Sequence, residues 1–265
     1  MSFKYYVKIF STIVKLKLSR QMIYSANFWI QILVDVAVFL IQLVTFETIY
    51  AHVDTINGWN RYHMIFFLGT FMLIDCIGMS GYYLGLASIP YKVRGGLLDM
   101  YIVKPISTIF FLSFEEVNLG SLFIAVPSLY MIAYSVENLA IKVTVVKAVG
   151  YIILIVMMLL LLYDILLIFR TASFWIVSTE ALEGFQAEIE NFSFRIPGIA
   201  LKGVWKVLFY IVIPMGVIAT IPTQFFTQHL RLQMWGFVIL LCAVFTILSH
   251  VLWRFGLKHY SSVCG

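Results

Sequence analysis

Six apolar segments, each close to the length of a membrane-spanning helix, follow one another along the chain. A helix needs about 20 residues to cross the hydrocarbon core of a bilayer. The six segments cover Phe28–Tyr50, Met64–Ala87, Val117–Val136, Val143–Phe169, Val204–Thr223 and Met234–Trp253. Only 12% of the 265 residues are charged, about half the fraction usual in soluble domains. We therefore predict an all-α polytopic membrane protein with six transmembrane helices, folded as one membrane domain over residues 1–265.

The first 27 residues predict a different kind of helix. Lys4, Lys8 and Lys15 recur at helical spacing, and aromatic and aliphatic residues lie between them. This pattern is typical of an amphipathic helix that lies among the lipid headgroups, with its lysines toward water. We expect the helix to lie at the cytoplasmic membrane surface.

The distribution of basic residues predicts the orientation of the chain. If the N-terminus is inside, fourteen of the 18 Lys and Arg residues fall on the inner side and four on the outer side. Cytoplasmic loops carry such an excess of positive charge. We therefore expect both termini, the loop over residues 89–107 and a connector over residues 170–203 to be cytoplasmic. The net charge of +5 is spread over short loops, which indicates contact with anionic lipid and not with nucleic acid.

The stretch "YKVRGGLLDMYIVKPIS", residues 91–107, interrupts the apolar pattern after the second segment. Pro90 and Pro105 bracket it, and the Gly95-Gly96 pair permits a tight reversal. Between them, "LLDMYIV" predicts about two turns of helix with Asp99 near the start, where a carboxylate suits the helix dipole. A plain connecting loop is the alternative.

Short motifs follow one another along the whole chain. The loop contains a G-x-L-D-x-Y-x-x-[KR]-P pattern through Gly96, Leu97, Asp99, Tyr101, Lys104 and Pro105. Further motifs are Phe174-Trp175, Arg195-Ile196-Pro197 with isoleucine in place of an aromatic residue, the prolines Pro214 and Pro222, and a closing Trp253, Gly256, Leu257 and Tyr260. Together they resemble the motifs of the six-span permease subunit of ABC-type exporters, in the class that contains antibiotic and polysaccharide exporters.

The resemblance implies that the loop is a coupling helix that docks on a cytoplasmic ATP-binding subunit. Its contact residues would be Arg94, Asp99, Tyr101, Lys104 and Pro105. The chain has no G-x-x-x-x-G-K-[ST] motif, so ATP and Mg would bind to the partner and this chain would not be an enzyme.

The same resemblance implies a second permease, identical or a sister chain, and a cavity between the two that works by alternating access. The substrate would be an amphipathic or hydrophobic molecule, such as a drug, lipid or peptide, exported across the cell membrane. A bacterial cytoplasmic membrane is the expected location.

Acidic residues inside the apolar segments are candidates for the substrate path. A central Asp costs about 3 kcal/mol on membrane-insertion scales, so each acid needs a compensating role. We expect Asp35, Asp75 and Asp164 to line a weakly acidic path that favours cationic amphiphiles; packing of a hydrogen-bonded carboxyl against a neighbouring helix is the alternative. Gly78, Gly81 and Gly85 fall on one arc of the second segment and predict close helix packing.

Two other functions compete with transport by a permease. The "GMSG" stretch places Ser80 within the second segment and His250 lies in the sixth, which is the residue pair of a rhomboid-like intramembrane serine protease. A channel would need a continuous polar stripe, and the sequence has only scattered acids. No spacing of His, Cys or acidic residues indicates a metal site.

Overall fold

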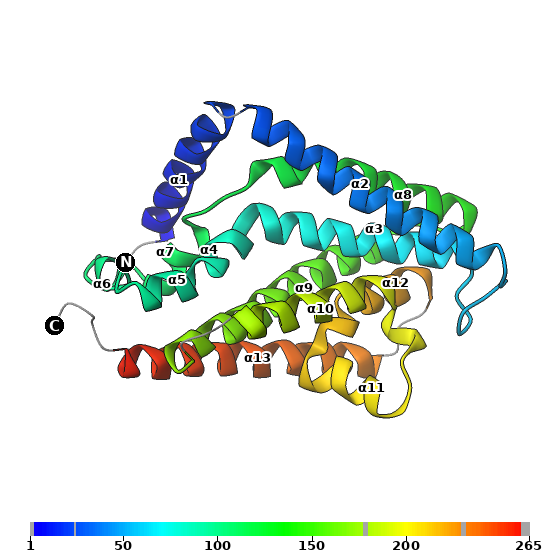
Figure 1. The fold of residues 1–265 in the computed structure, drawn as a ribbon. Coiled ribbons are helices and arrows are strands. Elements are labelled where there is room, and N and C mark those ends of the chain that lie inside the picture. Colours follow the sequence, from blue (N-terminus) through cyan, green and yellow to red (C-terminus); the bar gives the residue numbers. More distant parts are fainter. Residues whose placement is uncertain (1–2, 24, 177–179, 229–231, 261–265) are drawn as a thin grey trace.

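The chain folds into a bundle of long helices that run roughly along one direction (Figure 1). This computed structural model describes residues 3–23, 25–176, 180–228 and 232–260. Within these ranges 83% helix and no strand are present, which confirms the all-α prediction. The helices that form the candidate membrane spans are α2 (Ser25–Tyr50), α3 (Arg61–Gly78), α8 (Ala125–Asn138), α9 (Val145–Thr171) and α13 (Leu232–His259). Five segments of the described chain are long and apolar enough to cross a membrane.

Short elements extend several of these helices. The second crossing runs from α3 through the π-helical turn η1 (Met79–Tyr83) and α4 (Leu84–Ala87) into α5 (Ile89–Arg94). The 3₁₀ turn η2 (Leu119–Ile124) leads into α8, and η3 (Ala172–Phe174) ends α9. These extensions lengthen the continuous apolar segments to 34, 20 and 30 residues. Each therefore reaches the length that a bilayer requires.

The two ends of the bundle differ. The helix α1 (Phe3–Ile23) and the last residues of α13 lie at the same end, here called the termini end (Figure 1). The loop between α2 and α3 marks the other end, here called the opposite end. There Asn60 caps α3 by accepting hydrogen bonds from the backbone N–H groups of Tyr62 and His63. The prediction of a helix near the N-terminus is confirmed, and its place among lipid headgroups stays a prediction.

The core is built around α9, because this helix contacts α3, α10, α12 and α13. Leu154, Met158, Leu161 and Leu167 on α9 are completely buried. Burial of a leucine side chain contributes about 1.5–3 kcal/mol in water, whereas in lipid the gain comes from close packing of the helices. α9 thus fixes the relative positions of the helices that carry the candidate sites.

The helix α10 (Glu180–Arg195) passes from the termini end toward the opposite end. Its first half meets the end of α9 through the Phe185 and Phe169 rings, 6.4 Å apart. Its second half meets α3 through Phe194 and Phe71, 4.8 Å apart. Just beyond it, the carbonyl of Ile199 accepts a hydrogen bond from Asn57 in the loop at the opposite end. The prediction of a connector at the cytoplasmic side over residues 170–203 is therefore wrong for this helix.

The predicted fifth span, Val204–Thr223, is not a continuous helix. Its first arm joins α11 (Gly203–Val207) to the π-helical turn η5 (Leu208–Val212), and its second joins η6 (Pro214–Val217) to α12 (Thr220–Thr227). The arms meet at an angle of 84°. Pro214 causes the break, because proline has no backbone N–H to continue the helical hydrogen bonds.

Contacts at both ends of this bent pair place it as a hairpin that enters and leaves at the opposite end. Its first arm begins four residues after Ile199, which contacts the loop there. Its second arm ends near Phe226, whose ring stacks on Phe66 at 5.2 Å. The bend lies deep in the bundle, where Met215 faces a space that Asp75 and Leu162 also line. The fifth passage along the bundle is thus made by α10, and the hairpin follows it.

Two glycines of the second crossing have different surroundings, which gives a test of its packing. A Cβ added at Gly85 would lie 2.2 Å from the carbonyl oxygen of Ser113 and 2.4 Å from that of Leu112. A Cβ at Gly81 would meet nothing within 4 Å. A Cβ at Gly78 would lie 3.1 Å from the Tyr82 hydroxyl one turn later and 3.6 Å from Leu162 of α9.

Gly85→Ala is expected to reduce stability by about 1–3 kcal/mol, the usual cost of forcing extra atoms into a packed contact. The melting temperature of the detergent-solubilised protein measures this change. Gly81→Ala is the matched control and should melt like the wild type. Equal melting temperatures for the two variants would mean that α4 does not pack on the segment Leu112–Ser113 as described.

Candidate functional site

The loop over residues 91–107 forms two short helices at the termini end. α5 ends at Arg94, and Gly96 takes a positive φ of 67° at the reversal that follows. α6 covers only Asp99–Ile102, so it is shorter than the two turns predicted. The loop then continues into α7 (Thr108–Phe114), whose first turn is capped by Ser107. A proline and a capping serine therefore end the loop sharply.

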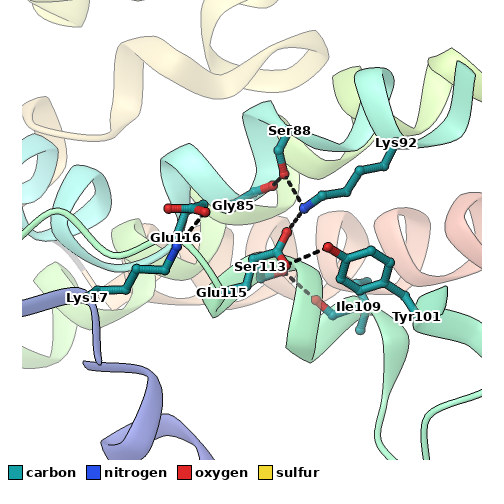
Figure 2. A network of polar contacts seen from close by, with 9 residues as sticks. All are labelled: Lys17, Gly85, Ser88, Lys92, Tyr101, Ile109, Ser113, Glu115 and Glu116. Carbon is teal, nitrogen blue, oxygen red and sulfur yellow. Dashed lines mark hydrogen bonds and ion pairs between the residues drawn. The ribbon is translucent and has the colours of Figure 1, made fainter. Parts of the chain in front are cut away.

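Polar contacts fasten this loop to the bundle (Figure 2). The Lys92 ammonium group forms an ion pair with Glu115 and donates a hydrogen bond of 2.8 Å to the Ser88 hydroxyl. The Tyr101 hydroxyl donates to the other oxygen of Glu115 at 2.9 Å. Lys92 and Glu115 are both largely buried, their side chains 10% and 14% exposed. A buried pair of this kind holds the geometry of the loop, because removing one partner would leave a buried charge.

Tyr101 points into the bundle and not outward. Its ring lies between two lysine side chains, with the ammonium nitrogens of Lys92 and Lys104 each 4.8 Å from its centroid. Burial, together with the nearby Glu116 carboxylate, raises the pKa of the Tyr101 hydroxyl. The hydroxyl therefore stays protonated and able to donate to Glu115. Of the predicted contact residues, Tyr101 thus serves the loop itself.

The outward face of the loop is apolar and flanked by basic residues. Tyr91, Met100 and Val103 are 67%, 55% and 80% exposed. Arg94 and Lys104 lie beside them and are also exposed, as is Pro105. Asp99 is half-buried at the start of α6. Large exposed apolar side chains on a polar end of a membrane protein are typical of a protein–protein contact. We call Tyr91, Met100, Ile102 and Val103 with these basic residues the loop face.

A cavity of about 330 Å³ brings together carboxylates from three helices. Asp35 comes from α2, Asp75 from α3 and Glu190 from α10. Phe71, Met72, Cys76, Met79, Tyr83 and Phe194 supply most of the apolar and aromatic wall. Of the residues that the structure describes, no Lys, Arg or His lines the cavity. Two of the three predicted path residues thus meet at one site.

Glu190 was missed by the sequence reasoning. It accepts hydrogen bonds from the Tyr83 hydroxyl at 3.1 Å and the Gln186 side-chain amide at 3.4 Å. Its segment carries too many charges to resemble a membrane span, so the sequence predicts a connector there. The usable signal was the helical spacing of Gln186, Ile189 and Ser193, the residues of α10 that are buried.

Asp164 lies apart from the cavity, completely buried between α9 and α13. Its two carboxyl oxygens accept hydrogen bonds from Thr246 and Ser249 of α13, both at 2.6 Å. This is the arrangement that the alternative interpretation describes, a carboxyl that packs against a neighbouring helix. Its predicted role in a substrate path has no support from its position.

Ser80 and His250 do not form a catalytic pair. The Ser80 hydroxyl donates to the carbonyl of Ile77 in its own helix. His250 lies on the exposed face of α13, and its ring nitrogen is 2.9 Å from the carbonyl oxygen of Thr246. A serine nucleophile needs its base within hydrogen-bond reach. In the described part of the chain, no group of three His, Cys, Asp or Glu residues is arranged to hold a metal ion.

The motifs at the end of the chain meet the Phe-Trp pair after α9. The Phe174 ring lies 5.4 Å from that of Trp253 and 6.2 Å from that of Tyr260. A Cβ on Gly256 would lie 2.3 Å from the same ring, so the close approach depends on this glycine. Motifs about 80 residues apart in the sequence thus form one packed cluster beside the loop.

Comparison with known families agrees with this arrangement. The sequence model of the ABC-2 family transporter proteins matches residues 36–264. The chain belongs to the ABC-2 transporter family. It is therefore a multi-pass membrane permease subunit of an ABC transporter, and the family implies an ATP-binding partner. Neither curated proteins nor solved structures give a significant match.

The buried carboxyl on α9 gives a second test. Asp164→Ala should lower stability by about 1–3 kcal/mol, because two hydrogen bonds between α9 and α13 are lost in a buried place. Asp164→Asn retains a carbonyl oxygen that accepts one of them and should cost less. The melting temperatures of both variants in detergent measure the difference. An Asp164→Ala protein that melts with the wild type would rule out a structural role.

Proposed function

We propose that this ABC-2 permease exports amphipathic cations, with ATP hydrolysed on a partner subunit. The observation that carries the proposal is the cavity lined by Asp35, Asp75 and Glu190, with no basic residue among the described residues of its wall. Carboxylates among aromatic and methionine side chains attract a positive charge that is attached to an apolar body. A neutral lipid would gain nothing from three acids, and an anion would be repelled.

The loop face supports docking of the ATP-binding subunit. Its exposed apolar residues would enter a groove of the partner, and Arg94 and Lys104 would pair with acids at its rim. The buried Lys92–Glu115 pair and the hydrogen bond from Tyr101 keep the loop rigid. A rigid element transmits the movement of a bound domain, whereas a flexible loop would absorb it.

A second permease would cover the polar side of α10. Gly184, Ala187, Glu188, Asn191 and Arg195 are exposed on one face of this helix, which is opposite to the buried face. Polar and charged side chains in the middle of a membrane protein face another chain or water, because lipid offers them no partner. Ala187 and Asn191 also line the acidic cavity. A second copy or a sister chain at this face would therefore close the cavity from outside.

Transport would then follow an alternating cycle. The substrate would enter from the cytoplasm or the inner leaflet and bind at the acidic cavity. Closure of the ATP-binding subunits would shift the loop and reshape the cavity toward the opposite end. The bent hairpin Gly203–Thr227 lies on that side of the cavity, with Met215 at its bend. Its position suits a barrier that separates the cavity from the outside.

The loop face gives the third prediction. Val103→Asp places a charge in the proposed apolar contact and should weaken binding of the ATP-binding subunit by about 2 kcal/mol or more, as at an interface hot spot. Co-purification of that subunit with the tagged permease measures the loss. Val53→Asp is the same change at an exposed site of the opposite end and should leave co-purification unchanged. Equal retention of the subunit by both variants would refute docking at this face.

The cavity gives the fourth prediction. Asp75→Asn and Glu190→Gln should each weaken binding of tetraphenylphosphonium, a lipophilic cation, about ten-fold, which corresponds to about 1.4 kcal/mol. Equilibrium dialysis on the purified protein measures the dissociation constants. Asp54→Asn, in the loop at the opposite end, removes the same charge far from the cavity and is the control. Unchanged affinity in the cavity variants would place the cation elsewhere.

A further inference from the structure

The helix α1 is fastened to α7, the helix that follows the loop. Edge-to-face ring contacts join Tyr6 to Phe110 at 4.9 Å and Phe10 to Phe114 at 5.6 Å. Tyr6 and Phe10 are four residues apart and therefore lie on one face of α1. This face is thus the docking face of the amphipathic helix, while Lys15 on another face is exposed.

An ion pair extends this contact. Lys17, seven residues after Phe10 and so on the same face, reaches the Glu116 carboxylate at 2.5 Å. The side chains are 20% and 43% exposed, so the pair lies at the surface. Surface ion pairs add little to overall stability. The Lys17–Glu116 pair instead fixes a position. It holds the later turns of α1, which are closest to α2, against the end of α7.

Glu116 is the direct neighbour of Glu115, which holds the loop. Figure 2 shows the two carboxylates bonded in different directions, one to Lys92 and Tyr101 and the other to Lys17. Two adjacent residues at the end of α7 thus connect the loop with α1. A single planar peptide unit joins the two residues, so a displacement of Glu115 also moves Glu116.

The path continues from α1 into the cavity. α1 ends at Ile23, and α2 starts at Ser25 and carries Asp35 in the cavity wall. The segment Ile32–Tyr50 of α2 is the least buried of the five candidate membrane spans. Besides α1, α2 contacts η2 and α3, so a displacement of α1 would reach Asp35 through the first turns of α2. A shift of α1 would therefore move Asp35 relative to Asp75.

We infer that Glu115 and Glu116 are positioning residues that transmit movement of the loop through Lys17 and α1 to the cavity wall on α2. The inference rests on the proposed function for the meaning of that movement. The physical linkage itself does not depend on transport and is testable by itself.

The first experiment measures whether Lys17 and Glu116 hold α1 in place. Ile13, on α1, is 9% exposed and is replaced by cysteine, in a chain where Cys264 is changed to serine; Cys76 and Cys242 are buried. A membrane-impermeant maleimide is applied to inverted vesicles. Lys17→Glu should raise the labelling rate of the cysteine at least about five-fold, because like charges would then face each other.

Matched variants separate the ion pair from a general effect of charge. Lys15→Glu makes the same change on the exposed face of α1 and should leave labelling within about two-fold of the parent. The double variant Lys17→Glu with Glu116→Lys restores opposite charges and should return labelling to the parent rate. Labelling in Lys17→Glu no greater than in Lys15→Glu, or no recovery in the double variant, would overturn the linkage.

The second experiment measures transmission, with the permease purified together with its ATP-binding subunit. Lys17→Glu should reduce stimulation of ATP hydrolysis by tetraphenylphosphonium at least about five-fold and leave basal hydrolysis unchanged, with recovery in the double variant. Loss of α1 docking with full stimulation would overturn the transmission role. If the wild-type complex shows no stimulation, the proposed function fails, and the labelling result still decides the linkage.

Discussion

The structure depends on how it accommodates carboxylates inside an apolar bundle. An ionised or hydrogen-bonding group is costly to bury, and the cost falls only if partners are supplied. Asp164 receives two hydroxyl donors from α13, and Glu115 receives an ammonium group and a phenol. Both carboxyls therefore hold helices together. Glu190 accepts hydrogen bonds from Tyr83 and Gln186, and among the described residues none that lines the space it shares with Asp35 and Asp75 is basic. Such a lining would suit the proposed binding of a positive charge from outside.

The apolar pattern predicted most of the fold, because length and hydrophobicity are all that a lipid-facing helix needs. Four of the six predicted spans correspond to the segments around α2, α3, α9 and α13, and the 3₁₀ turn before α8 begins the third. The fifth was misassigned for a physical reason. The second arm is apolar because it is buried in the bundle, as Val217 and Ile221 are. The first arm is apolar but exposed, with Val204 82% exposed, as expected of a surface that faces lipid. Apolarity indicates contact with protein or lipid but does not tell a crossing from a return.

Hydropathy is misleading for α10 in the opposite way, because it predicts a loop where the chain forms a helix of the bundle. The helix carries acids and a basic residue, because one of its faces is exposed and only the other is buried in the bundle. Hydropathy averaged along the sequence mixes the residues of the two faces, so it predicts a polar loop. Glu190 lies on this helix. The sequence therefore predicts only two of the three acids of the cavity, Asp35 and Asp75, together with Asp164, which lies elsewhere. Only the course of the chain shows that α10 lies beside α3 and brings the third acid to the cavity. The contacts Phe71–Phe194 and Asn57–Ile199 fix that course.

The motif of the loop predicts where the loop lies but not which of its side chains point outward. Its G-x-L-D-x-Y-x-x-K-P pattern marks the element that leaves the bundle, yet Tyr101 is turned inward to Glu115 while Met100 and Val103 face outward. Alternation of this kind follows from a single helical turn, in which adjacent side chains point about 100° apart. Tyr101, a polar member of the motif, therefore keeps the loop rigid, and the apolar residues between the motif positions would supply the proposed contact. A loop that had only the contact residues would bind a partner but would transmit little of its movement.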